Sequence, residues 1–193
     1  MNSTTNDSVE PLRAFVAQCH QAMAEHADEA AQLAAIKPAL KTLLAQPDWL
    51  PASHMKPRDD RYAQYPLYVA ADNSLSVVSF VWKSGQWTPI HDHTVWGIIG
   101  VYKGVERTEV YEERDGAMVC TRTIDGQPGE VGAVSPSIGD VHKVGNVSDD
   151  TAISIHVYGG NIGLIERHVF EQDGTPKSFV SGYEPAPVLV PAA

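Results

Sequence analysis

The chain has 193 residues, of which 43% are apolar, so it can bury one good hydrophobic core and is expected to form a single domain over residues 1–193. Its formal net charge of −10 disfavours nucleic acid and anionic membranes as partners. The sequence contains no run of about eighteen apolar residues that would predict a membrane span, and no obligate protein partner is evident.

The cysteine content and the first residues indicate the compartment. Cys19 and Cys120 are too few for a disulfide framework and are expected to be reduced structural residues. The N-terminal residues have neither a basic region nor an apolar core, so no signal peptide is expected. These features together predict a cytoplasmic protein.

Residues 1–60 are expected to form a helical cover over one end of a barrel. Two stretches carry apolar residues at helical spacing. They contain Leu12, Phe15, Val16, Cys19 and Met23, and then Leu33, Ile36, Leu40, Leu43 and Leu44. Pro38 is expected to split the second stretch into two short helices, because proline removes a backbone hydrogen bond and its ring clashes with the preceding turn.

Residues 62–172 are dominated by short segments with the composition of strands. These cover residues 75–83, 95–101, 108–113, 118–124, 151–158 and 166–172. Asp115-Gly116 lies between two of them and is a hairpin signal. Many short strands separated by turn residues predict an all-β fold with N-terminal helices, a double-sheet jelly-roll β-barrel. The proline-interrupted residues 173–193 are expected to lie extended over its surface.

Two separate segments supply candidate metal ligands. In Gly85-Gln-Trp-Thr-Pro-Ile-His91-Asp-His93, a strand would place both imidazoles on one face, where they can converge on one point. About fifty residues later, Gly139-Asp-Val-His142 offers a third imidazole. Three protein ligands that leave other positions open are typical of a catalytic metal site. The pair alone is equally typical of a half-buried strand with two ordinary histidines.

These two segments resemble the paired motifs of the cupin superfamily. The matching positions are Gly85, His91, His93 and Gly104 in the first motif, and Gly129, Pro136, Gly139, His142 and Asn146 in the second. The second motif has one extra residue between its proline and its glycine. The resemblance implies a metal-binding jelly roll, although Gly97 stands where most cupins carry a ligating glutamate. Three neutral imidazoles leave a divalent metal its full charge, which favours an anionic ligand such as a thiolate, and they suit iron, zinc, copper or nickel.

A third segment, Ser154-Ile-His156-Val-Tyr158, alternates polar with apolar side chains. At a strand period of two, the three polar groups share one face and can form a chain of hydrogen bonds that ends at a phenol. They would otherwise be the solvent face of a half-exposed strand. With three candidate ligands nearby, we favour the hydrogen-bonded relay.

From about Tyr62 to Phe170 the sequence resembles the thiol dioxygenases, relatives of cysteine dioxygenase. The resemblance rests on His-Asp-His-Thr followed by Val95-Trp96-Gly97, and on Ser-x-His-x-Tyr-Gly. It implies iron(II) held by His91, His93 and His142, and a Ser154–His156–Tyr158 relay whose phenol reaches towards the metal. It also implies oxidation of a small thiol by O2 to a sulfinate, a reaction of sulfur metabolism.

Two departures from the animal-type enzyme indicate the substrate. Gly97 stands where that enzyme has a cysteine cross-linked to the relay tyrosine, so Tyr158 is expected to be a free phenol. Gln64 replaces an arginine that pairs the substrate carboxylate, and an amide cannot form such a charged bidentate bond. The resemblance to 3-mercaptopropionate dioxygenases assigns the carboxylate to Arg167. An arginine beside Glu166 is otherwise typical of a surface ion pair.

The function expected is therefore oxidation of 3-mercaptopropionate to 3-sulfinopropionate by an iron(II) dioxygenase. A first alternative keeps this chemistry and takes L-cysteine, which becomes cysteine sulfinic acid. A second is a zinc or manganese cupin isomerase or hydrolytic enzyme. A third is a cupin that binds a small molecule without catalysis.

Overall fold

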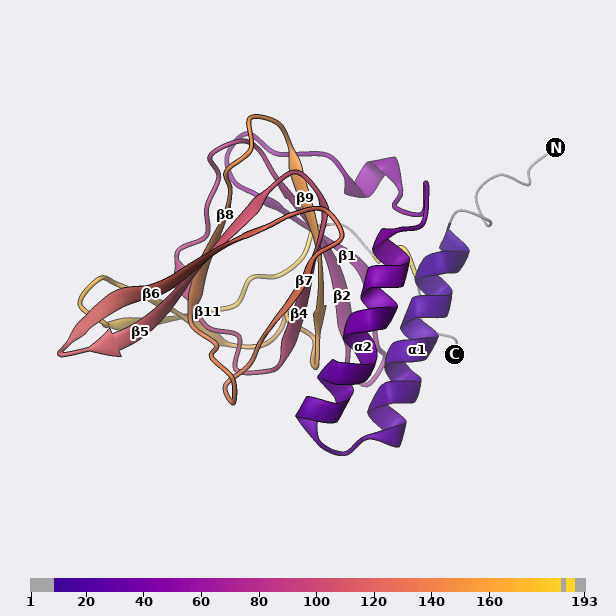
Figure 1. Ribbon diagram of the computed structural model, residues 1–193, viewed down its shortest axis with the longest axis horizontal. Helices are drawn as coiled ribbons and strands as arrows, with labels where there is room; N and C mark the ends of the chain where they lie inside the picture. The colour runs from indigo at the N-terminus through magenta and orange to yellow at the C-terminus, as the bar shows by residue number, and fades with distance from the viewer. Residues whose placement is uncertain (1–8, 185–186, 190–193) are drawn as a thin grey trace.

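The structure, a computed structural model, describes residues 9–184 and 187–189. Two N-terminal helices pack side by side against a barrel of two antiparallel sheets (Figure 1). Helix α1 spans Glu10–Glu25, helix α2 spans Glu29–Leu44, and a short 3-10 helix, η2, spans Ala52–His54. Within the described residues, no helix combines the length and the hydropathy needed to cross a bilayer.

The barrel consists of a five-stranded and a six-stranded sheet. The first sheet contains, in spatial order, β1 (Ala63–Val69), β2 (Ser76–Trp82), β9 (Ala152–Tyr158), β4 (Gly97–Lys103) and β7 (Val131–Val134). The second contains β11 (Pro176–Phe179), β10 (Arg167–Phe170), β3 (Ile90–His91), β8 (His142–Asn146), β5 (Glu106–Arg114) and β6 (Ala117–Gly126). The chain passes repeatedly from one sheet to the other, as in a jelly roll. The predicted all-β barrel with N-terminal helices is confirmed.

Strands β2 and β9 are buried on both faces, and the period of two divides their side chains between two cores. Val77, Val81, Ile153 and Ile155 pack in the core shared with the helices. The alternate residues of β2 (Val78, Phe80 and Trp82) and Tyr158 of β9 belong to a second core, inside the barrel. The interior face of β9 is the one that carries the polar side chains of the predicted relay.

Helix α2 lies close against β4 because Gly100 has no side chain. A Cβ at this position would come within 2.7 Å of Leu44 and 2.9 Å of Leu40, both of which are buried. The helices therefore cover the outer face of the first sheet, and the predicted helical cover has this place in the fold (Figure 1).

The expected break at Pro38 is wrong, because α2 continues through Pro38. The carbonyl that loses its partner belongs to Ala34, and both residues lie on the exposed side of the helix, where water can bond this carbonyl. At the other end of α2, Asp28 caps the helix by accepting a hydrogen bond from the Ala31 amide at 2.9 Å. Burial of the opposite side of α2 favours one continuous helix.

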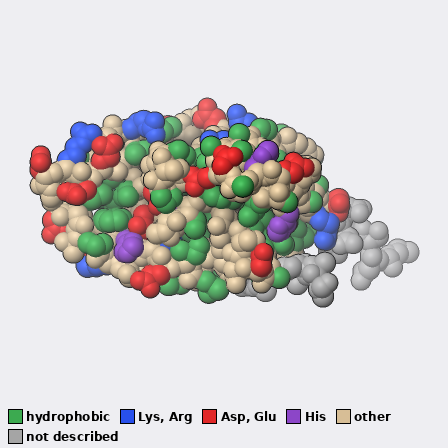
Figure 2. All heavy atoms as spheres, turned by 90° about the horizontal axis from the view of Figure 1, so that it is seen from below, with side chains coloured by type: hydrophobic (Ala, Val, Ile, Leu, Met, Phe, Trp, Pro, Cys, Tyr) green, Lys and Arg blue, Asp and Glu red, His purple; other side chains and the backbone are tan. Residues whose placement is uncertain are grey.

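The β5–β6 hairpin projects from the barrel, with the predicted Asp115-Gly116 turn at its tip (Figure 1). Both turn residues have positive φ, 52° and 76°, as hairpin turns of this kind require. Arg107 donates two hydrogen bonds to Asp125 across the hairpin. Acidic, basic and hydrophobic side chains are mixed over the face of the molecule seen in Figure 2.

The second sheet extends beyond residue 172, where the sequence placed the end of the barrel. Strand β11 pairs with β10, and Leu189 forms a bridge with Tyr68 of β1. Backbone pairing therefore holds part of the predicted C-terminal tail. Residues 185–186 and 190–193 of that tail lie outside the described residues, as do residues 1–8.

Leu40→Ala is expected to lower the free energy of unfolding by about 2–5 kcal/mol, because it leaves a cavity between α2 and β4. Lys41→Ala, an exposed change on the same helix, should alter stability by no more than about 0.5 kcal/mol. Urea unfolding of both variants measures the difference. Equal stabilities for the two would contradict the packing described above.

Candidate metal centre

Three buried histidines meet inside the barrel. His91 ends β3, His142 begins β8, and the two residues face each other in the antiparallel register. His93 follows two residues after His91, and the ligand atoms of all three lie within 4.8 Å of one another. The pairing of β3 with β8 thus joins the two predicted segments.

Hydrogen bonds to oxygen acceptors orient two of the imidazole rings, those of His91 and His93. His91 Nδ1 lies 3.0 Å from the carbonyl of Pro89, and His93 Nδ1 lies 2.8 Å from Asp140 Oδ1. The other carboxylate oxygen of Asp140 accepts hydrogen bonds from the backbone amides of His93 and Thr94. Each Nδ1 therefore carries its ring hydrogen, and the Nε2 lone pair is free for a metal. His93 lies beyond β3, so Asp140 positions it rather than a regular strand.

The surroundings keep these imidazoles neutral. Burial and the neighbouring imidazoles lower the pKa of His91 and of His142 well below its ordinary value, and burial also lowers the pKa of His93. Burial opposes ionisation of Asp140, but His93 and the Thr94 amide together outweigh it and keep the pKa of Asp140 low. At neutral pH the three rings can act as ligands without losing a proton.

The donor set fits a divalent first-row metal. Three neutral nitrogens are available, and Nδ1 of His142 is buried without a hydrogen-bond partner in the described part of the chain. Gly97 supplies no fourth ligand. A Cβ at this position would lie 3.0 Å from the ring of Tyr158, so a larger side chain would displace the phenol. The histidines form a candidate metal centre.

The predicted relay is a continuous chain of hydrogen bonds. Ser154 Oγ lies 2.8 Å from His156 Nε2, and His156 Nδ1 lies 2.9 Å from the Tyr158 hydroxyl. All three side chains are buried, which excludes the alternative of a solvent-exposed face. Trp82 donates a hydrogen bond to Ser154 Oγ at 3.2 Å, and Phe80 stacks on the His156 ring. Burial raises the pKa of Tyr158, so its phenol keeps its hydrogen.

A cavity of about 220 Å³ joins the centre to the other predicted site residues. Its polar lining consists of Gln64, His91, His142, His156, Tyr158 and Arg167, together with Thr88. The aromatic rings of Tyr62, Phe80 and Trp82 form much of one wall. Residues from both sheets thus meet in one pocket, as the proposed site requires.

Arg167 is the unusual group in this pocket. Its side chain is 5% exposed, its guanidinium lies over the Phe179 ring, and one nitrogen donates to Ser181 Oγ at 2.9 Å. No carboxylate pairs with it among the described residues, and its Nε has no partner there. The alternative of a surface ion pair with Glu166 is therefore not observed. A buried guanidinium without a counter-ion favours binding of an anion.

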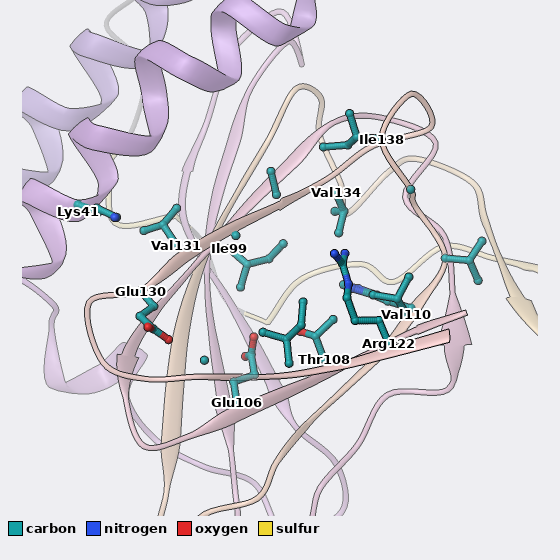
Figure 3. Close-up of a pocket in the computed structure, with 17 residues that line it drawn as sticks. Lys41, Ile99, Glu106, Thr108, Val110, Arg122, Glu130, Val131, Val134 and Ile138 are labelled. Atoms are coloured by element: carbon teal, nitrogen blue, oxygen red, sulfur yellow. The ribbon is translucent and has the colours of Figure 1, made fainter. Parts of the chain in front are cut away.

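A second, larger cavity of about 400 Å³ shares only His142 with this pocket. Figure 3 shows its aliphatic walls, with Glu106 and Arg122 among the lining residues. Sequence reasoning missed Glu106, Asp140 and Trp82. The Gly-Asp-Val-His order of the second motif was a signal for Asp140, but nothing in the sequence indicated that Glu106 is buried.

No protein-family profile matches the chain. Among solved structures, it is similar to a double-stranded β-helix protein from Klebsiella pneumoniae subsp. pneumoniae MGH 78578, with 16% identity over 65% of this chain and 90% of that one, at a TM-score of 0.43. An RmlC-like cupin family protein from Methanocaldococcus jannaschii gives 13% identity over 55% and 87% of the two chains, at 0.42. Recombinant oxalate oxidase in complex with glycolate gives 20% identity over 61% and 62%, at 0.45. Likeness at this level carries no conclusion about activity.

The metal-free protein is expected to lose stability as the pH falls below about 6.5, the pKa of histidine in an unfolded chain. Because the folded protein holds the pKa of His91 and of His142 lower, the unfolded chain binds more protons in acid, and the free energy of unfolding decreases. Above that pH the effect is absent.

Thermal unfolding in chelator, from about pH 7.5 to about pH 5, measures this dependence. A double variant, His91→Gln with His142→Gln, should show a shallower fall in Tm than the unaltered protein. Parallel curves for the two proteins would mean that these imidazoles are not protected from protonation.

Proposed function

We propose that the protein is a mononuclear non-haem iron(II) dioxygenase, which oxidises a small carboxylate-bearing thiol with O2 to its sulfinic acid. The observation that carries the proposal is Arg167, a buried guanidinium without an anionic partner, in the same small pocket as the histidines and Tyr158. A substrate with one anionic group for Arg167 and one for a metal cation fits this arrangement.

His91, His93 and His142 would hold the iron, which would supply the redox chemistry that activates O2. Arg167 binds the substrate carboxylate and so fixes the distance between the anchored end and the sulfur. The Tyr158 hydroxyl, held by His156, donates a hydrogen bond towards the reacting sulfur or oxygen. Both atoms of O2 end on sulfur, which loses four electrons as O2 gains four, and the thiol proton is released.

Within this class we propose 3-mercaptopropionate as the substrate, with 3-sulfinopropionate as the product. Gln64 lines the pocket but carries no charge, so Arg167 is the only cationic side chain in its described lining. The cavity of about 220 Å³ suits a short acid. L-cysteine shares the thiol and the carboxylate, but its ammonium would enter a pocket whose described lining has no carboxylate to receive it.

The protein should bind about one iron per chain, and His142→Ala should remove both metal and thiol oxidation, because two ligands remain where three are needed. His26→Ala, in the turn between the helices, is the matched control and should keep both. Metal analysis after iron loading and oxygen uptake with thiols provide the measurements. Full thiol oxidation by His142→Ala would exclude the three-histidine site, and turnover with zinc alone would exclude redox chemistry.

The kcat/KM for 3-mercaptopropionate should exceed that for L-cysteine, mostly through KM. Arg167→Ala should lose about 1.5–3 kcal/mol of transition-state binding, the range for a charged hydrogen bond, and Gln64→Arg should shift preference towards cysteine. Arg122→Ala, which removes a guanidinium from the other cavity, serves as the control. If cysteine is used at least as well and Arg167→Ala changes neither constant, the substrate is cysteine and the carboxylate is held elsewhere.

A further inference from the structure

We propose that Glu106 is the outer end of the relay and carries the proton released during thiol oxidation from His156 to the second cavity. That the proton comes from thiol oxidation rests on the proposed function. The coupling of Glu106 to His156 does not. Glu106 would act through His156, without contact to the substrate.

The burial of Glu106 requires an explanation. It begins β5, between β8 and the edge strand β6 of the second sheet, where it faces Asn146 of β8 and Gly126 of β6. Its side chain is 3% exposed, and its Oε2 has no hydrogen-bond partner in the described part of the chain. A buried carboxylate without a partner opposes folding, so its presence here points to a role other than stability.

A proton-carrying group of the relay lies close to Glu106. Glu106 Oε2 lies 3.9 Å from His156 Nε2, and the other ring nitrogen lies 2.9 Å from the Tyr158 hydroxyl. An imidazole can take a proton at one nitrogen and release one from the other. The separation exceeds a hydrogen bond, and Ser154 Oγ lies nearer to Nε2, at 2.8 Å, so the transfer requires the flexible Glu106 side chain to rotate towards the ring.

The other side of Glu106 leads to solvent. Figure 3 shows the carboxylate projecting into the cavity of about 400 Å³. Arg122, Glu130 and Ile138 also line this cavity and are exposed, so it opens at the surface of the protein. Glu106 therefore separates the buried relay from water on the side opposite the substrate pocket.

The proposed reaction supplies the proton that this path would carry. One thiol and one O2 give one sulfinate and one proton. A proton leaving the sulfur passes to the Tyr158 oxygen as the phenol hydrogen moves to His156 Nδ1. Nε2 then releases its hydrogen to Glu106, and Glu106 gives it to water in the second cavity. Along this path only bonds to hydrogen are made and broken, and no additional reactant is needed.

Glu106→Gln and Glu106→Ala test the transfer in the iron-loaded protein. Glutamine fills the same space but carries no acidic proton, so kcat should fall by about tenfold or more with KM unchanged. The kcat of Glu106→Ala should fall likewise. Formate or acetate should restore it by entering the vacated space, whereas chloride should not. Neither acid should restore the glutamine variant. Unchanged kcat in Glu106→Gln, or equal rescue of both variants, would overturn the proposal.

A second measurement is independent of thiol oxidation. In the zinc-loaded, 15N-histidine-labelled protein, Glu106→Gln should shift the NMR signal of His156 Nε2, which a His156→Gln variant identifies. Arg122→Gln, on the same cavity, is the matched control and should leave this signal in place. An unmoved His156 signal in Glu106→Gln would exclude the coupling. A shifted signal in a protein that oxidises no thiol would keep the coupling and reject the proposed function instead.

Discussion

The pairing of β3 with β8 is the constraint on which the rest of the site depends. Strand β3 is only two residues long, yet His91 faces His142 on one side and Val169 of β10 on the other. Because side chains alternate along a strand, a slip of one residue would turn His142 away from the centre. The same short strand fixes β10, which begins with Arg167. One register therefore places the candidate metal ligands and the candidate anion anchor in the same pocket.

The electrostatics of this pocket follow from burial. Desolvation keeps the three imidazoles neutral, while Asp140, the carboxylate nearest to them, is engaged by His93 and by two backbone amides. The Arg167 guanidinium has no carboxylate partner in the described structure. A metal cation would add further positive charge. The pocket is thus suited to a ligand with two anionic groups, and a thiolate with a carboxylate is the simplest example.

The central position of β9 allows a polar relay to exist inside an otherwise apolar barrel. Its outward side chains pack beneath the helices, and its inward side chains meet Trp82, Phe80 and Glu106. A complete hydrogen-bonded chain in such surroundings is strong, and a broken one is costly. His156 lies between Tyr158, which lines the smaller pocket, and Glu106, which lines the second cavity.

Local patterns in the sequence were enough to predict the fold class, the histidine segments and the alternating face of β9, because strand periodicity and turn residues act over a few positions. They could not show that α2 continues through Pro38, since packing of the opposite side of the helix against the barrel favours this. Nor could they show that Asp140 positions His93, or that Glu106 lies beside His156. The role of Arg167 in carboxylate binding was assigned by resemblance. Only the tertiary structure showed that its side chain is buried and does not pair with Glu166. Strand pairing between residues distant in the chain determines these contacts, and no local pattern encodes it.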